Sequence, residues 1–208
     1  MSDDLTHPIT TQSFAIIDRE IGEHSFTMTE YAIIRRIIHT TADFEFKQLV
    51  KFEHSAIASG ITAISAHTPI VVDVGMVKQG IIGLLAKTFE NPVINALELA
   101  SSSDLADAGD RTRSEIGMRA CMQQHPEAIF VVGNAPTALL ALCQPTDFVF
   151  APKLIIGAPV GFVSVLESKA VLAASSHPHI RIEGRKGGSP VAAAIVNALV
   201  TLAWEQKS

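Results

Sequence analysis

The sequence predicts an α/β protein: a three-layer α/β/α single domain with a mainly parallel sheet of about five strands. Short runs of β-branched and aliphatic residues alternate with longer segments of helical periodicity in the second half of the chain. This alternation is typical of right-handed crossovers, which place helices on both faces of a parallel sheet. The 48% hydrophobic content, with only 6% aromatic residues, suits close packing of helices on such a sheet.

We expect the 208 residues to form one domain, 1–208, because no linker-like stretch or run of charges divides them. The net charge of -5 argues against a nucleic-acid partner. The N-terminus lacks a signal-peptide pattern and no apolar run reaches membrane-spanning length, which predicts a cytoplasmic protein with no membrane partner. Cys121 and Cys143 lie in apolar helical contexts without metal-ligand spacing, so we expect buried core thiols.

The first strongly patterned element is a helix that starts with a capping box at Thr27 and Glu30. Apolar residues follow at helical spacing as far as Ile38. His39 falls near the end of this helix, where the backbone dipole favours a protonated imidazole. Such a histidine can simply be bonded to a backbone carbonyl, but the Thr-Thr-Ala-Asp that follows favours a functional role.

The later elements are predicted in alternation, with the strands as short apolar runs between turn residues. The predicted strands span 69–74, 93–97, 128–133, 153–157 and 180–182, and the predicted helices span roughly 44–66, 76–88, 111–124, 136–144, 160–175 and 188–204. In a parallel sheet the ligand crevice lies beyond the carboxyl ends of the strands. We therefore expect the site in the loops that lead from strand to helix.

Three of these loops share one composition, with glycine and small residues after a strand and proline near the first helical turn. They span 133–137, 157–161 and 184–190. The free amides at the start of each following helix can bind an anion. Any one of these loops could also be ordinary Gly/Pro punctuation. None matches a phosphate loop or a dinucleotide fingerprint, which disfavours a nucleotide.

Several charged residues fit an anion site. Arg185 and Lys186 lie in a glycine-rich loop at a predicted helix start, where the dipole works against cations, and this position indicates a function. Arg113 also opens a helix and is either a ligand contact or a solvated charge. Asp73 follows a strand, where capping of the next helix is preferred over orienting a substrate.

Neither a metal nor a cofactor is predicted. His177 and His179 form the nearest approach to a metal pair, but they lack a third ligand and are expected in an exposed turn. His54 and His67 are expected on helices without a partner. No nucleophile elbow or Ser-His-Asp order is present.

Motifs spread over nearly the whole chain carry a family resemblance. In order, they are His7-Pro8-Ile9, Ser13–Ile17 with Glu20, Ile38–Phe44, Thr112–Ser114, Gly133–Leu139, Gly157–Val163, Glu167–Lys169 and Gly184–Ser189. Together they resemble the precorrin-8X methylmutase family of corrin biosynthesis. The later motifs are long and unusual, which makes a chance resemblance improbable.

The resemblance implies an isomerase of cobalamin biosynthesis that moves a methyl group from carbon eleven to carbon twelve of the corrin ring. It also implies a homodimer, a substrate near the subunit interface and His39 as the catalytic residue. Together with Arg185 and Lys186 of the glycine-rich loop, the substrate contacts that it implies are Ser13, Thr40, Thr41, Arg113, Asn134, Thr137, Gly161 and Phe162. It leaves open whether precorrin-8X becomes hydrogenobyrinate or cobalt-precorrin-8 becomes cobyrinate. The His-Thr-Thr-Ala-Asp form looks more like the cobalt branch.

The chemistry of this reaction agrees with the residues. A macrocycle rimmed with carboxylates needs several helix-start amides and arginines around a wide crevice. An internal methyl shift needs no nucleophile or redox group, whereas one donor to a ring nitrogen would polarise the conjugated system. Two alternatives remain: a tetrapyrrole carrier without turnover, for which His39 is dispensable, and a phosphate-ligand enzyme on a doubly wound sheet.

Overall fold

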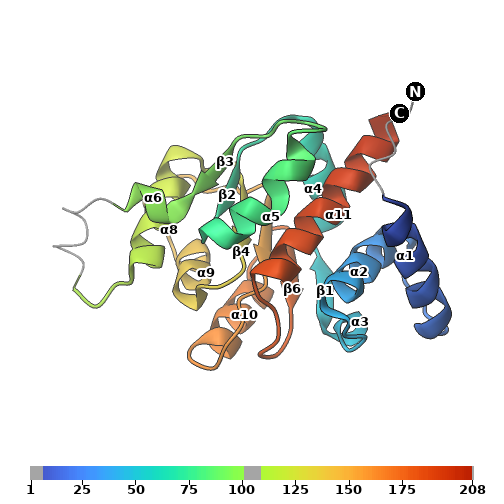
Figure 1. Ribbon diagram of the computed structural model, residues 1–208. Helices are drawn as coiled ribbons and strands as arrows, with labels where there is room; N and C mark the ends of the chain where they lie inside the picture. Colours follow the sequence, from blue (N-terminus) through green and yellow to red (C-terminus); the bar gives the residue numbers. More distant parts are fainter. Residues whose placement is uncertain (1–6, 101–108, 208) are drawn as a thin grey trace.

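One six-stranded sheet forms the centre of the structure, a computed structural model that describes residues 7–100 and 109–207 (Figure 1). The strand order is β1-β6-β5-β4-β2-β3, with β1 antiparallel to β6 and all other neighbours parallel. The strands are β1 Val50–Glu53, β2 Ile70–Val72, β3 Val93–Asn95, β4 Ile129–Val132, β5 Leu154–Gly157 and β6 His179–Ile182. The predicted mainly parallel α/β sheet is confirmed, with one strand more than expected.

Helices cover both faces of the sheet because alternate strand residues point to opposite sides. Ile70 and Val72 join a hydrophobic cluster with α2, α4, α5 and α11, whereas Val71 joins a second cluster with α6, α8, α9 and α10. Helix α1 packs outside α2. The helices are α1 Pro8–Glu20, α2 Met28–Thr41, α3 Phe46–Leu49, α4 Ala56–Ser65, α5 Gly75–Leu85, α6 Ala96–Leu99, α8 Arg113–Gln124, α9 Pro136–Cys143, α10 Val165–Ala173 and α11 Ser189–Lys207.

The predicted helix over 44–66 is wrong in its middle, where β1 replaces it. Val50–Glu53 pairs with β6, from Val50 opposite Ile182 to Glu53 opposite His179. His54 and Ser55 then take positive φ angles of 52° and 59°, which end the strand and prevent a continuous helix. The alternating Val-Lys-Phe-Glu pattern is typical of a strand, but the predicted helix over 44–66 did not take it into account.

The predicted helix over 160–175 starts late. Gly161 and Ser164 have φ angles of 140° and 57°, so α10 begins only at Val165. Pro159 therefore lies in a loop, whereas Pro136 and Pro190 lie in the first turns of α9 and α11 as predicted. The loop after β5 is consequently longer than expected.

Helix α11 contributes many side chains to the hydrophobic core. It is 19 residues long, rich in alanine and valine, and buried along most of its length against α2, α4 and α5. Its first residue, Ser189, lies at the carboxyl edge of the sheet. Even so, none of the helices in the described ranges combines the length and the apolarity that crossing a bilayer requires.

Both cysteines behave as predicted for core thiols. Cys121 is buried and Cys143 is half-buried, and neither forms a disulfide. Burial raises the pKa of each thiol to about 11. Thiols with such pKa values stay protonated and unreactive at neutral pH.

Candidate active site

His39 lies in the last turn of α2, and the sequence of that helix places it there. The predicted capping box is present: Thr27 accepts from the Glu30 amide, and Glu30 accepts from the Thr27 amide at 2.8 Å. The helix ends at Ala42, whose φ of 53° is a left-handed cap. The imidazole of His39 is exposed, and the ring of Phe14 on α1 meets it edge-on at a centroid distance of 5.4 Å.

The two threonines after His39 use their hydroxyl protons within the helix. Thr40 donates to the Arg36 carbonyl and Thr41 to the Ile37 carbonyl, each at 2.9 Å. Thr41 also accepts from the Asp43 amide at 3.3 Å. Their hydroxyls therefore shape the helix end and can only accept from a substrate in this arrangement.

Helix α1 contacts α2 through side chains on one face of α2. Asp18 on α1 accepts from the hydroxyl of Tyr31 and pairs with Arg35 at 3.1 Å. The Arg35 guanidinium also lies 4.3 Å from the centroid of the Phe14 ring. Because Tyr31, Arg35 and His39 are spaced by four residues, they share one face of α2, and this face orients His39 against α1. Burial and Asp18 together raise the pKa of Tyr31 to about 12.

Ser13 precedes Phe14 on the same helix. Its hydroxyl donates to the carbonyl of Ile9 at 2.9 Å. The side chain is half-exposed. Ser13 therefore lies beside the Phe14–His39 contact, with its proton used within α1 and its lone pairs open to a donor.

Asp73 has a role that the sequence did not predict. It does not cap α5, which has no side-chain cap. Its carboxylate instead accepts from the amides of Gly133, Asn134 and Ala135 in the loop after β4, at 3.0, 2.7 and 2.8 Å. Burial raises the pKa of this carboxyl, and the three amide bonds act in the opposite direction.

This contact corrects the prediction of free amides after β4. The Asp73 carboxylate already occupies the anion site that the first of the three loops forms. The Asn134 side chain is exposed above this loop and remains available. Gly133 is packed so closely on the backbone of Ser189 that an added Cβ would lie 2.8 Å from the Ser189 Cα, which ties the loop to the start of α11.

A buried lysine holds the glycine-rich loop after β6. The Lys169 ammonium on α10 donates to the carbonyls of Gly184 and Lys186 at 2.7 and 2.8 Å. Burial lowers the pKa of Lys169 to about 8. Gly187 has a φ of 150° and passes so close to Ala158 that a Cβ would lie 2.4 Å from its carbonyl oxygen, so only glycine fits there.

Lys186 is not a free cation in this structure. Its ammonium pairs with Asp43 at 2.5 Å and with Glu45 at 2.7 Å, and both acidic residues follow the His39 helix end. These carboxylates raise the pKa of Lys186, and the lysine in turn lowers the pKa of Asp43. The predicted substrate cation therefore acts here as the link between the glycine-rich loop and the end of α2.

The loops after β5 and β6 are joined beside this link. The Gly161 amide donates to the Arg185 carbonyl at 3.2 Å. The Arg185 guanidinium lies 5.7 Å from the centroid of the Phe162 ring. Phe162 and Val163 are 83% and 84% exposed, so the loop after β5 presents apolar surface next to a cation. The structure therefore brings together Gly161, Phe162 and Arg185, which were predicted as substrate contacts.

Arg113, Asn134 and Thr137 lie further along the same carboxyl edge. Thr112 caps α8, and its hydroxyl is 2.7 Å from that of Thr137 on α9, so the first turns of these two helices touch. The exposed Arg113 guanidinium donates to the Leu97 carbonyl at 3.0 Å, and among residues 7–100 and 109–207 its other N–H groups have no acceptor. These three predicted contact residues lie at one edge because the carboxyl ends of parallel strands share it, and their role as substrate contacts stays a prediction.

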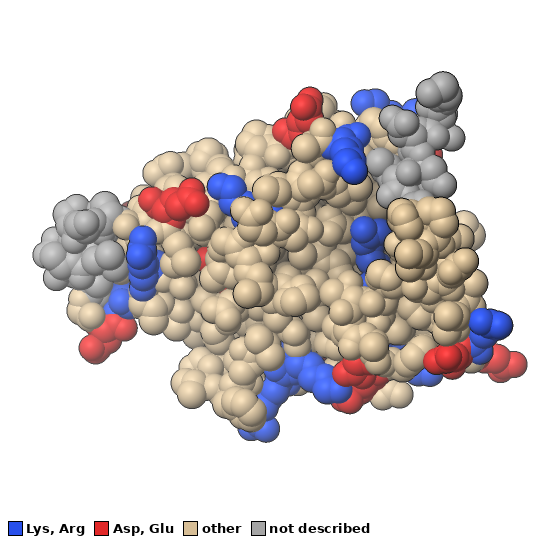
Figure 2. All heavy atoms as spheres, in the orientation of Figure 1, with Lys and Arg blue, Asp and Glu red and all other residues tan. Residues whose placement is uncertain are grey.

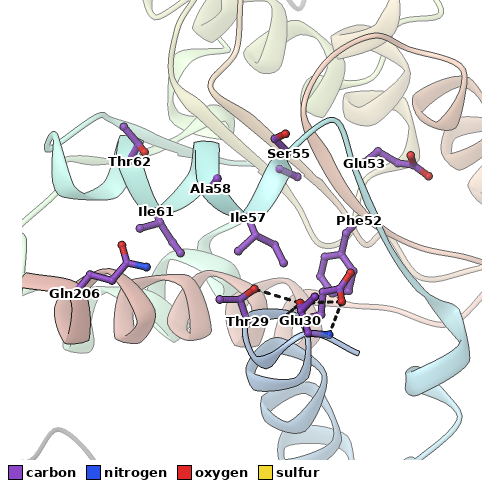
Figure 3. A pocket seen from close by; sticks show the side chains of 12 residues that line it. Thr29, Glu30, Phe52, Glu53, Ser55, Ile57, Ala58, Ile61, Thr62 and Gln206 are labelled. Atoms are coloured by element: carbon purple, nitrogen blue, oxygen red, sulfur yellow. Dashed lines mark hydrogen bonds between the residues drawn. The ribbon is translucent and has the colours of Figure 1, made fainter. Parts of the chain in front are cut away.

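A cavity away from the carboxyl edge is lined by other residues. Its volume is about 500 Å³, and Figure 3 shows Ile57 and Ile61 of α4 beside Phe52 of β1 and the start of α2. Glu30 borders this cavity, and at a rise of about 1.5 Å per residue His39 is about 13 Å further along the helix. We base the candidate site on the chemistry at the carboxyl edge, because Glu30 in the cavity is used by the capping box.

Three other histidines lie in surroundings that differ from those predicted. His179 is buried in β6, not in an exposed turn as predicted, and its Nδ1 is 2.8 Å from the His177 carbonyl. His54 and His67 do not lie in helices, and His67 contacts the Phe89 carbonyl. Among residues 7–100 and 109–207, no group of three His, Cys, Asp or Glu side chains could hold a metal ion.

Comparison with known proteins identifies the family. A family model described as precorrin-8X methylmutase matches residues 8–202. The chain is 52% identical to a cobalt-precorrin-8 methylmutase of Synechocystis, over 97% of this chain and 98% of that protein. It is 39% identical to one of Leptospira interrogans, over 93% and 92%. A crystal structure of precorrin-8X methylmutase from Thermus thermophilus superposes with a TM-score of 0.87 at 41% identity, covering 95% of this chain and 96% of that one. The chain therefore belongs to the precorrin-8X methylmutase family.

Proposed function

We propose that His39 is the proton or hydrogen-bond donor through which this methylmutase moves a methyl group from carbon eleven to carbon twelve of a corrin ring. The family assignment makes the chain an isomerase of cobalamin biosynthesis acting on a corrinoid. The observation that supports His39 is its placement. It is the exposed imidazole at the carboxyl edge, set against Phe14 and next to the Lys186 link to the glycine-rich loop.

The reaction needs one proton or hydrogen-bond donor to the ring and several groups that bind the substrate carboxylates. Migration within one molecule breaks one carbon–carbon bond and forms another without an external nucleophile. A donor at a ring nitrogen draws electron density from the conjugated system and lowers the barrier to migration. An imidazole on a fixed helix end can donate in this way without reorganising during the reaction.

The anchors are proposed around the same edge. The free N–H groups of Arg113, the exposed Asn134 amide and the Arg185 guanidinium can each receive a carboxylate. The exposed Phe162 can lie against the macrocycle face. Ser13, Thr40, Thr41, Thr137 and Gly161 lie beside these groups as weaker contacts, and we assign Lys186 to holding the loop in place.

The cobalt-containing substrate is favoured. Both the Synechocystis relative at 52% identity and the Leptospira relative at 39% carry the name cobalt-precorrin-8 methylmutase. We therefore expect cobalt-precorrin-8 to be converted to cobyrinate faster than precorrin-8X is converted to hydrogenobyrinate. Product formation from each substrate, followed by absorption, tests this. Binding of both substrates without turnover would mean a carrier instead of an enzyme.

We further propose that the chain works as a homodimer and as a single domain in the reducing cytoplasm. Ile9, Phe162 and Val163 expose large apolar side chains, which is typical of a surface that another chain covers. The two reduced thiols fit a reducing compartment. Sedimentation at micromolar concentration should give twice the chain mass of 22.2 kDa, and a species of 22.2 kDa alone would contradict the dimer.

A further inference from the structure

The buried lysine of α10 binds backbone carbonyls instead of a carboxylate. Lys169 is 4% exposed, and its ammonium donates to the carbonyls of Gly184 and Lys186 at 2.7 and 2.8 Å. Within residues 7–100 and 109–207 it forms no ion pair, and its third N–H has no acceptor. A neutral donor could make the same two bonds without the cost of burying a charge, which indicates that the charge serves a purpose.

The glycine-rich loop that accepts these bonds connects several parts of the candidate site. The Arg185 carbonyl accepts from the Gly161 amide in the loop after β5, at 3.2 Å. The Lys186 ammonium pairs with Asp43 and Glu45, which follow the end of α2. Figure 2 shows basic and acidic side chains next to one another along the lower edge of the molecule, over this loop and the start of α3. The conformation of this loop therefore affects how the loop after β5 and the end of α2 lie relative to each other.

The backbone of this loop has little intrinsic preference for its observed shape. Gly184, Gly187 and Gly188 have φ angles of 70°, 150° and 114°, and glycine populates many other conformations as readily. The Gly188 amide donates to the Ala158 carbonyl at 2.7 Å and holds the end of the loop. The segment 184–186 is held at two of its three carbonyls by the Lys169 ammonium.

We propose that Lys169 is a positioning residue whose protonated ammonium holds the glycine-rich loop in the conformation that binds the corrinoid, so that loss of this proton weakens binding. The inference rests on the proposed function, because the loop conformation matters only if the loop contacts the substrate. Hydrogen bonds from an ammonium are about twice as strong as those from a neutral amine. Burial lowers the pKa of Lys169 from the ordinary 10.5 to about 8, which brings loss of the proton close to neutral pH.

Neighbouring charged groups neither neutralise Lys169 nor titrate in its place. The titratable and charged residues on α10, on the elements packed against it and in the loop are Glu167, Cys143, His179, Arg181, Glu183, Arg185 and Lys186. Burial alone causes the pKa shift of Lys169. Burial also lowers the pKa of His179 and raises that of Cys143 to about 11, and two carboxylates raise that of Lys186. These three groups therefore keep their charge between about pH 7 and about pH 9.5.

The effect on global stability has the opposite sign over this pH range. The folded pKa of Lys169, about 8, is below the ordinary 10.5, so the unfolded chain binds more protons and a rising pH favours the folded state. A fall in corrinoid affinity as the pH rises is therefore not explained by unfolding through this group. This difference in sign separates a positioning role from general support of the fold.

The experiment measures the affinity for cobyrinate at about pH 7 and about pH 9.5, where the carboxylates of this ligand are ionised throughout. Binding is measured because a proton donor at His39 would itself make turnover depend on pH. The parent should bind about five- to thirtyfold more weakly at the higher pH, since two charge-assisted bonds become neutral ones. Lys169→Arg keeps its charge and should bind equally at both pH values, whereas Lys169→Met should bind weakly at both. Lys87→Met, which removes an exposed lysine, is the matched control and should follow the parent.

Trypsin cleavage gives a second measurement that needs no corrinoid. Arg185 and Lys186 are the cleavage sites within the glycine-rich loop, so mass spectrometry of the fragments reports how firmly this loop is held. At about pH 7, Lys169→Met should be cut there about fivefold faster than the parent or more, because both bonds to the loop are lost. Lys87→Met should be cut at the parent rate.

Four results would overturn the positioning role while leaving the proposed function in place. They are equal affinity of the parent at both pH values, an equal fall in the parent and Lys169→Met, an equal fall in the parent and Lys169→Arg, and faster cleavage of Lys169→Met with unchanged affinity. Circular dichroism confirms folding at both pH values, and if Lys169→Met does not fold, the parent and Lys169→Arg still decide. A parent protein that does not bind cobyrinate at about pH 7 would overturn the positioning role and the proposed function together.

Discussion

The Phe14 ring on α1 meets the His39 imidazole on α2 edge-on, with centroids 5.4 Å apart. The Arg35 guanidinium lies 4.3 Å from the centroid of the same ring. One aromatic residue on a peripheral helix therefore positions the proposed catalytic side chain. This arrangement couples α1, which is mostly exposed, to the chemistry at the carboxyl edge.

Removing that ring should reduce turnover more than binding. An aromatic pair contributes about 0.5–1.5 kcal/mol beyond burial, so Phe14→Ala should lower kcat roughly two- to tenfold. KM should change less, because most carboxylate contacts lie on other elements. Steady-state kinetics measure this split. Phe148→Ala, a half-buried phenylalanine on the other face of the sheet, should leave kcat unchanged. A loss confined to KM would show that Phe14 does not position His39.

Asp73 should be essential to the fold of the loop after β4. Asp73→Asn keeps one carbonyl acceptor but turns an NH2 group toward a backbone amide, which should destabilise the protein by about 2–3 kcal/mol. Urea unfolding measures the difference. Asp147→Asn, at an exposed position, is the matched control and should be neutral. Equal stability of both variants would contradict the role given to the three amide bonds.

Lys169 should make stability depend on pH in a defined window. Its folded pKa of about 8 is below the ordinary value of 10.5, so the unfolded chain binds more protons between these values. The stability of the parent relative to Lys169→Met should therefore rise as the pH increases from about 8 to 10.5, by at most about 1.4 kcal/mol per pH unit. Urea unfolding of both proteins at several pH values tests this. A difference that stays constant or falls would contradict it.

The Lys186 link should act as one unit with Asp43. Lys186 pairs with Asp43 at 2.5 Å and with Glu45 at 2.7 Å, so Lys186→Met should lower turnover at least as much as Asp43→Asn, which leaves the Glu45 pair in place. The double variant should be no slower than Lys186→Met alone, because that change already removes the contact with Asp43. Kinetics of the three variants form the test. Effects that multiply in the double variant would show that the two residues act separately.

The sequence predicted the parallel core because the strands from 70 onward are continuous apolar runs bounded by turns. It missed β1 because that strand is stabilised by pairing with β6, far along the chain, and not by its own propensity. The role of Asp73 required knowing that β2 lies beside β4, which local spacing does not contain. Lys169 was part of a quoted motif, but its function as a loop anchor depends on carbonyls 15 and 17 residues away.

The candidate site residues divide in the same way, into features that local sequence rules predict and features that depend on contacts far along the chain. Placement of His39 at a helix end and of the three loops at one edge follows from local rules, and the structure agrees. Local sequence does not predict whether a loop amide or a lysine is available to a ligand. Asp73 accepts from the Asn134 amide and Asp43 pairs with Lys186, and both contacts join residues that are far apart in the sequence.

The most direct test of the account is single-turnover methyl migration by His39→Ala and His39→Asn under saturating cobalt-precorrin-8. Removing a positioned general acid costs about a hundred- to ten-thousandfold in rate, so His39→Ala should be slower by this factor while still binding the substrate. His39→Asn should be similarly slow if a proton is transferred, whereas retained activity would reduce the role to hydrogen bonding. Turnover of His39→Ala at the parent rate, in a variant shown by circular dichroism to be folded, would contradict the central claim.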